Sequence, residues 1–180
     1  MRLRGAKAGS ETQMRSRLAL WVVVLAAFVT LSASSIQGAS PTGTIEGRIA
    51  VIRGGGDVVP GARVPLWLHA RGIDVQGIIR KHRTDSGSEA LQKLAILTMI
   101  LEFTKLLDSQ EYRKYQVATT TANFDGEFRF SGLPTGRWYY VTAIYETNFS
   151  TVIWHMPVAL QSYSRVELSN DNAALPIYNR

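Results

Sequence analysis

The chain contains three histidines, the side chains most often used as metal ligands and as general bases near neutral pH. His69, His82 and His155 form no H-x-x-E or H-E-x-x-H pattern, the spacings that set metal-binding groups on one helix face. His82 and Asp85 are three residues apart and could bind the same ion, but two isolated groups seldom make a site. The sequence therefore predicts neither a metal site nor a cofactor site.

Nucleophilic catalysis would need an activated serine or cysteine with a base beside it. The chain has no cysteine, which excludes a thiol nucleophile, a cysteine zinc site and a disulfide framework. Serine is common, but no Gly-x-Ser-x-Gly nucleophile elbow occurs. We therefore predict no catalytic residues and a protein that is not an enzyme.

Aromatic side chains are the remaining candidates for chemistry, because flat rings can stack on the faces of sugar rings. The residues that could form such a ligand or partner surface are Trp67, Tyr139, Tyr145, Phe149 and Trp154. Strands favour aromatic residues for packing alone, so burial of the same rings in a core is the competing interpretation.

The net charge of the chain is +6, from 20 Lys and Arg against 14 Asp and Glu in 180 residues. Residues 1–17 carry five basic residues and one acidic residue, so this segment accounts for +4 and the remainder for +2. No block of five or six like charges lies in that remainder. The charge pattern therefore predicts no nucleic-acid partner.

The basic N-terminal segment runs directly into an apolar stretch at residues 18–31, which small residues follow. A basic start, a short apolar core and a small-residue exit are typical of a secretory signal peptide. We predict a signal peptide at residues 1–39, cleaved at a site within residues 33–39. The apolar stretch is shorter than the ~20 residues of a typical membrane-spanning helix.

Two alternatives remain open at this end of the chain. Translation could begin at Met1 or at Met14, since Met14 is followed by two arginines and then the apolar stretch. The expected location is secreted or periplasmic, and an uncleaved anchor formed by residues 18–31 would instead hold the protein at a membrane.

Alternation of apolar and polar residues, the pattern of a half-buried strand, recurs after residue 40. The expected strands are residues 44–51, 62–68, 116–121, 127–130, 138–145, 151–156 and 163–168. Turns rich in Gly, Pro, Asn and Asp separate them. Seven short strands with such turns predict an antiparallel β-sandwich.

A segment of helical character interrupts the strands. Residues 90–107 contain no glycine or proline, and their apolar side chains cover nearly the whole circumference of a helix. We expect this helix, in an insertion at residues 72–115, to be covered on more than one side. Strand 138–145 is apolar on both faces, so the helix is expected on its outer face. The competing interpretation is that the helix docks on a partner or self-associates with a second copy.

The strand regions on both sides of the insertion carry a recognisable pattern of turns. It begins with Gly-Thr-Ile-Glu-Gly-Arg-Ile at residues 43–49 and Val-Pro-Gly-Ala-Arg-Val-Pro-Leu at residues 59–66, and continues through residues 119–138. The turn residues of the last stretch are Asp125, Gly126, Leu133, Pro134 and Gly136. These residues are typical of tight turns and have a structural role.

This pattern resembles the carboxypeptidase regulatory-like domain, a transthyretin-like or carbohydrate-binding-like β-sandwich. The resemblance covers residues 44–71 and 116–145. Trp138 replaces the tyrosine usual in that family, and Phe124 stands where a small residue is usual. The helical insertion is a further departure from the family.

The resemblance implies a mainly β fold: an antiparallel, seven-stranded transthyretin-like sandwich at residues 40–170 with one inserted α-helix, and a C-terminal tail at residues 171–180. Similarity of fold does not by itself assign a function. We expect an exported, non-catalytic binding or structural module of the cell envelope or extracellular space, with a protein or polysaccharide partner. The alternative is a carbohydrate-binding module that uses exposed aromatic residues.

Overall fold

The computed structural model describes residues 41–52, 56–147, 150–176 and 178–179. The expected signal peptide at residues 1–39, its alternative start and the alternative anchor at residues 18–31 lie outside the described residues.

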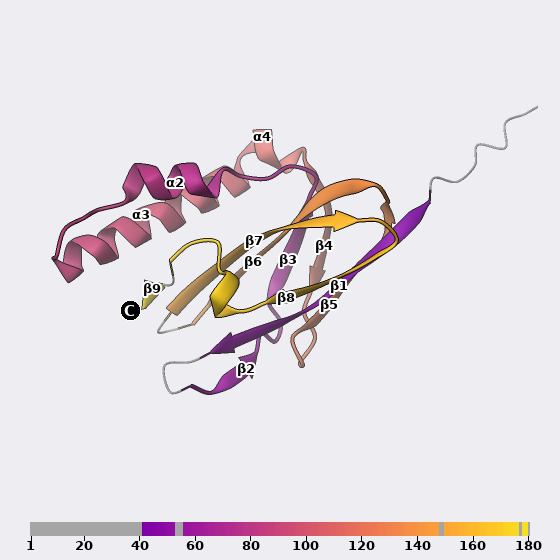
Figure 1. The fold of residues 1–180 in the computed structure, drawn as a ribbon, viewed down its shortest axis with the longest axis horizontal. Helices are drawn as coiled ribbons and strands as arrows, with labels where there is room; N and C mark the ends of the chain where they lie inside the picture. Colours follow the sequence, from indigo (N-terminus) through magenta and orange to yellow (C-terminus); the bar gives the residue numbers. More distant parts are fainter. Residues whose placement is uncertain (1–40, 53–55, 148–149, 177, 180) are drawn as a thin grey trace, which may run out of the picture. The chain divides into compact units, whose positions relative to one another are not determined.

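The first sheet is organised around a central strand. Strand β1 (Thr42–Ile52) pairs with β2 (Val58–Pro60), β5 (Glu127–Pro134) and β8 (Tyr163–Leu168). The pairings with β2 and β5 are antiparallel, and the pairing with β8 is parallel. Figure 1 shows β8 running alongside β1.

The second sheet is antiparallel throughout. Its strand order is β4 (Gln116–Thr121), β3 (Pro65–His69), β6 (Arg137–Glu146), β7 (Ser150–Leu160) and β9 (Tyr178–Asn179). A short 3₁₀ helix, η1 (Asn170–Asn172), follows β8 and leads the chain back toward the edge formed by β9.

The core between the sheets is formed by residues at alternate strand positions, as the sequence pattern predicts. Ile45 and Ile49 of β1 meet Leu66 of β3 and Val141 of β6, and all four side chains are fully buried. Burying large aliphatic side chains such as these is the main favourable term in folding.

The mainly β architecture with two sheets is confirmed, with two corrections. The described residues form nine strands, not seven, because β2 and β9 are too short to show alternation. The sandwich is also not wholly antiparallel, since β8 joins β1 in parallel. Alternation determines which face of a strand is buried and does not determine its neighbour or direction.

The insertion holds three helices, where the sequence predicted one: α2 (Val75–His82), α3 (Glu89–Asp108) and α4 (Gln110–Arg113). Ser109 separates the last two, because its Oγ accepts a hydrogen bond from the backbone N–H of Tyr112 (3.2 Å) and so begins a new helix.

The insertion covers the outer face of the second sheet (Figure 1), as expected from the apolar character of both faces of strand 138–145. Phe103 and Met99 of α3 and Ile78 of α2 are buried in one cluster with Ile153 of β7. Ile144 of β6 packs against this cluster. The molecule therefore has a second apolar layer outside the sandwich core.

Helix α3 is covered on one side only, which corrects the expectation of burial on several sides. Its opposite side carries exposed leucines, which we call the outer leucines of α3: Leu91, Leu94, Leu97 and Leu101. Leu101 is 70% exposed, whereas Phe103 two residues later is fully buried. None of the helices in the described ranges has the length and apolar character needed to cross a bilayer.

Candidate functional site

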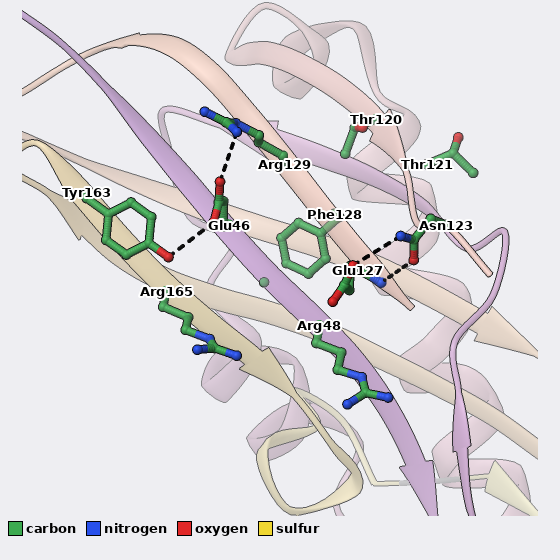
Figure 2. Close-up of a pocket in the computed structure, with 11 residues that line it drawn as sticks. Glu46, Arg48, Thr120, Thr121, Asn123, Glu127, Phe128, Arg129, Tyr163 and Arg165 are labelled. Atoms are coloured by element: carbon green, nitrogen blue, oxygen red, sulfur yellow. Dashed lines mark hydrogen bonds and ion pairs between the residues drawn. The ribbon is translucent and has the colours of Figure 1, made fainter. Parts of the chain in front are cut away.

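A groove of about 530 Å³ lies on the first sheet, beside the turn that joins β4 to β5. We call it the charged groove (Figure 2). The residues that line it are Glu46, Gly47 and Arg48 of β1, Glu127, Phe128 and Arg129 of β5, Tyr163 and Arg165 of β8, and Thr120, Thr121 and Asn123 at the end of β4.

The sheet pattern places the charged side chains in the groove. Ile45 and Ile49 of β1 point into the core, so Glu46 and Arg48 between them point outward. The same alternation buries Phe128 and Phe130 of β5 in the core.

Glu46 of β1 lies between Arg129 of β5 and Arg165 of β8, which face it from the two neighbouring strands. Its Oε1 is 3.2 Å from Nη1 of Arg129, and its Oε2 accepts a hydrogen bond of 3.1 Å from the Tyr163 hydroxyl. Arg165 faces Glu46 in the strand register but has no hydrogen-bond or ion-pair partner among the described residues. Glu46 is thus already neutralised by Arg129, and the charge of Arg165 remains available.

Arg48 is the next outward-facing residue of β1 after Glu46. It faces Glu127 of β5 and Glu167 of β8 in the register, yet the described part of the chain contains no ion pair to either. Its Nε donates instead to the backbone carbonyl of Asp125 at 3.1 Å. Glu127 accepts a 3.2 Å hydrogen bond from Nδ2 of Asn123. The terminal nitrogens of Arg48 are therefore open to the groove.

Between Glu46 and Arg48, β1 has a glycine, Gly47, because there is no room for a side chain at this position. A Cβ at this position would collide with the ring of Phe128 and with the backbone carbonyl of Val166. The second glycine of the Gly-Thr-Ile-Glu-Gly segment thus allows Phe128 to pack directly under β1. This close approach fixes the floor of the charged groove.

The side chains that line the groove can form hydrogen bonds with a polar ligand. Arg165 lies two residues after Tyr163 on β8, and the phenol ring of Tyr163 is 56% exposed. Arg48 lies further along the groove on β1. Thr120, Thr121 and Asn123 supply hydroxyl and amide groups from the side of β4. Such an arrangement suits a ligand with hydrogen-bonding groups and a flat or ring-shaped part.

The predicted aromatic surface is wrong for two of its five residues. Trp154 is fully buried, and its Nε1 donates to the backbone carbonyl of Ser169 at 2.7 Å. Tyr139 is 2% exposed, and its hydroxyl donates to the carbonyl of Pro134 at 2.7 Å. Both rings lie on the inner faces of β7 and β6, where they fill the sandwich core.

The other three predicted residues do not form a common surface. Trp67 is half-buried and lines a cavity of about 400 Å³ on the helical side of β3, together with Leu107 of α3. Tyr145 is half-buried and packs against the sandwich core. Phe149 lies outside the described residues.

The predicted turn residues lie at the two ends of β5. Asn123 closes the first turn, because its Oδ1 accepts backbone N–H groups of Asp125 (3.0 Å) and Glu127 (2.8 Å). Gly126 has φ +77° in this turn, and Gly136 has φ +72° after β5. Leu133 and Pro134 belong to β5 itself, and Leu133 is buried in the core.

Two histidines that the sequence left unassigned meet beneath the helical insertion. The Thr142 hydroxyl lies 2.8 Å from Nδ1 of His155 and 3.4 Å from Nδ1 of His69. Nε2 of His155 accepts the backbone N–H of Ile73 at 2.9 Å, so its proton resides on Nδ1. Burial lowers the pKa of each histidine to about 4, and for His155 the nearby His69 adds to the effect.

These histidines are enclosed by neighbouring rings. Tyr140 stacks on His155 with ring centroids 5.1 Å apart, and Tyr112 tilts against His69 at 4.7 Å. Within the described ranges, no three His, Asp or Glu side chains gather where they could hold a metal ion. The third histidine, His82, lies on α2 and contacts Glu102 of α3, which also binds Lys81.

Few features of the sequence indicate the charged groove. Its charged residues resemble the solvated face of any sheet, and only the register of three strands brings them together. The one usable signal is the alternation at residues 163–168, which places Tyr163 and Arg165 on the same polar face.

No protein-family model and no curated protein sequence matches the chain. Structural similarity extends to a candidate carbohydrate-binding protein from Pseudomonas aeruginosa, with 15% identity and a TM-score of 0.45 over 77% of this chain and 93% of the other. It also extends to the minor pilin GBS52 of Streptococcus agalactiae, with 13% identity and a TM-score of 0.38 over 73% of this chain and 44% of the pilin.

A third similar structure is the shaft pilin SpaA of Lactobacillus rhamnosus GG, with 9% identity and a TM-score of 0.36 over 77% of this chain and 50% of the pilin. The chain thus spans about half the length of the two pilins.

Proposed function

We propose that the chain is an exported, non-catalytic β-sandwich module that binds a polar ligand in the charged groove. The observation that carries this proposal is the pair Arg48 and Arg165, which face the groove without carboxylate partners among the described residues. Free guanidinium groups in a concave site are strong, directional hydrogen-bond donors. Export, to the envelope or the extracellular space, rests on the pattern of residues 1–39.

The non-catalytic part of the proposal rests on where the reactive side chains lie. His69 and His155, the residues best suited to acid–base chemistry, are 1% and 8% exposed beneath the helical insertion. They are on the other sheet from the charged groove and are not among its lining residues. This separation supports a groove that holds its ligand without transforming it.

Carbohydrate binding remains compatible with this site, but by a different surface from the predicted one. Trp154 and Tyr139 are buried, so a sugar would be recognised in the charged groove, with Tyr163 as the exposed ring. A polysaccharide of the cell envelope and a protein loop with polar groups are the two partner classes that such a groove serves.

The test is a binding assay with the chain lacking residues 1–39 against isolated envelope polysaccharides and envelope proteins. We expect Tyr163→Ala combined with Arg165→Ala to abolish capture of the ligand. Trp138→Ala is the control for the ring, because Trp138 is an aromatic residue of similar exposure (62%) on the other sheet. Equal capture by the wild-type chain and the groove variant would contradict the proposal.

A second candidate function is structural and rests on the outer leucines of α3. Leu94, Leu97 and Leu101 follow a 3–4 spacing, which is the spacing of helix–helix packing in coiled coils. Self-association through α3 would cover them. Sedimentation velocity over a range of concentrations would detect it, and Leu94→Gln with Leu101→Gln would abolish it.

A further inference from the structure

We propose that the ligand of the charged groove is an acidic saccharide, whose sugar carboxylate binds Arg165 and Arg48 while its ring lies on Tyr163. This inference rests on the proposed function, because it names the ligand class of the same groove.

The balance of charges in the groove favours an anion. Glu46 is neutralised by Arg129 at 3.2 Å, and Glu127 is held by Asn123 at 3.2 Å. Arg165 then has no partner among the described residues, and Arg48 donates only to a backbone carbonyl. The lining thus holds three arginines against two glutamates, an excess of one positive charge, and a planar guanidinium matches a carboxylate with two parallel hydrogen bonds.

The strand register brings these two cations together. Arg165 of β8 faces Glu46 of β1, and Arg48 is the next outward residue on β1. Arg48 and Arg165 are therefore diagonal neighbours on adjacent strands, a relation within the reach of long side chains. Figure 2 shows both guanidinium groups in the lower half of the view, with Arg165 beneath the Tyr163 ring.

A ring-bearing ligand explains the rest of the groove better than a bare anion does. The hydrogen bond to Glu46 holds the Tyr163 ring in one orientation. More than half of the surface of Tyr163 is exposed, so the ring is ready to contact a ligand. Thr121 and Asn123 line the opposite side, where they can bond to sugar hydroxyls. The volume of about 530 Å³ lies within the range of small-molecule sites.

A nucleic acid fits the same groove poorly. Glu127 and Glu167 face Arg48 from both neighbouring strands and would repel a continuous phosphate backbone. An acidic saccharide carries hydroxyl groups beside each carboxylate, so it can place its charges at the arginines and its hydroxyls near the glutamates. The alternation of charges along the strands thus favours a ligand in which charged and hydroxyl groups alternate.

The test is calorimetric titration of the chain lacking residues 1–39 with three polymers. Polygalacturonate carries sugar rings and carboxylates, its fully methyl-esterified form carries the same rings without charge, and polyacrylate carries the charge without rings. We expect polygalacturonate to bind about 10-fold or more tightly than either of the others, equivalent to one good charged contact.

Substitutions locate the binding. Arg165→Gln and Arg48→Gln should each weaken polygalacturonate binding about 10-fold, since each removes a charge-assisted contact. Arg137→Gln is the matched control, because it removes an exposed arginine from β6 of the other sheet and should leave binding unchanged. Circular dichroism and thermal unfolding would confirm that all three variants fold.

The outcomes separate the inference from the function on which it rests. If the esterified polymer binds as tightly as polygalacturonate, the ligand need not be acidic, and the groove is a site for neutral saccharides. If polyacrylate binds as tightly as polygalacturonate, the claim that the ligand is a saccharide is overturned. An equal effect of Arg137→Gln and Arg165→Gln overturns the location. Failure of all three polymers, together with no groove-dependent capture in the assay proposed above, overturns both the inference and the proposed function.

Discussion

The Thr142 hydroxyl and Nδ1 of His155 lie 2.8 Å apart in the layer between the second sheet and the helical insertion. Thr142 is fully buried, and its hydroxyl is also 3.4 Å from Nδ1 of His69. The three polar groups satisfy one another in an apolar layer only while both imidazoles are neutral. We therefore expect the attachment of the insertion to be sensitive to acid.

We expect the folded state to lose stability as the pH falls from about 6.5 to about 4. Both histidines have a pKa of about 4 in the folded protein, lowered from 6.5 mainly by burial. In that window the unfolded chain binds protons that the folded chain does not, so lower pH favours unfolding. The full effect is about 3 kcal/mol for each histidine, reached at the lower end of the window.

Urea unfolding at a series of pH values would measure this dependence. His155→Gln keeps hydrogen-bonding groups but cannot titrate, so its unfolding free energy should vary with pH by about one proton less. An unchanged pH dependence in His155→Gln would show that His155 does not sense the acid.

The two sides of α3 should respond differently to truncation. Phe103 is fully buried and meets the ring of His155 edge-on, with centroids 5.7 Å apart. Phe103→Ala should lower the free energy of unfolding by about 3–5 kcal/mol. Leu101→Ala, two residues away and on the exposed side, should change it by less than about 0.5 kcal/mol. Chemical denaturation of both variants checks this, and similar losses would contradict the one-sided packing of α3.

The glycines near β5 allow a matched test of backbone strain and space. Gly126 and Gly132 both have positive φ, +77° and +71°. A Cβ at Gly126 would meet the carbonyl of Ile49, whereas a Cβ at Gly132 would meet nothing within 4 Å. Gly132→Ala should cost about 1 kcal/mol, and Gly126→Ala clearly more. Thermal unfolding compares them, and equal losses would rule out the clash as the cause.

The tryptophans separate packing from surface exposure. Trp154→Phe removes the donor to the Ser169 carbonyl and leaves a void in the core, so we expect a loss of about 1–3 kcal/mol. Trp138→Phe changes a 62% exposed ring and should alter stability by less than about 0.5 kcal/mol. Denaturant unfolding measures both changes. An unchanged free energy of unfolding in Trp154→Phe would argue against the buried position of Trp154.

Much of the fold could be predicted because alternation reports directly on burial. In strand 138–145, Val141 and Ala143 face the sandwich core while Ile144 faces the insertion, which is why both faces are apolar. The need for a cover over this strand was therefore visible in the sequence. The break between α3 and α4 depends on a local cap at Ser109 that the apolar pattern does not report.

The candidate site was far less predictable. Trp154 and Tyr139 carry rings able to stack on a sugar, but residue type alone does not distinguish a surface ring from a core ring. The charged groove depends on three strands from distant parts of the chain and on their register. Glu46 becomes a neutralised residue, and Arg165 an available one, only once β5 and β8 lie on either side of β1.

The parallel pairing of β1 with β8 also constrains how the chain can fold. Thr44 pairs with Tyr163 and Ile49 with Leu168, so β1 lacks one neighbour until nearly the whole domain has emerged from the ribosome or a translocation channel. Pairings between such distant residues slow folding, and an unpaired strand edge is prone to aggregate. We therefore expect the edge of β1 in the nascent chain to be prone to aggregation until β8 pairs with it.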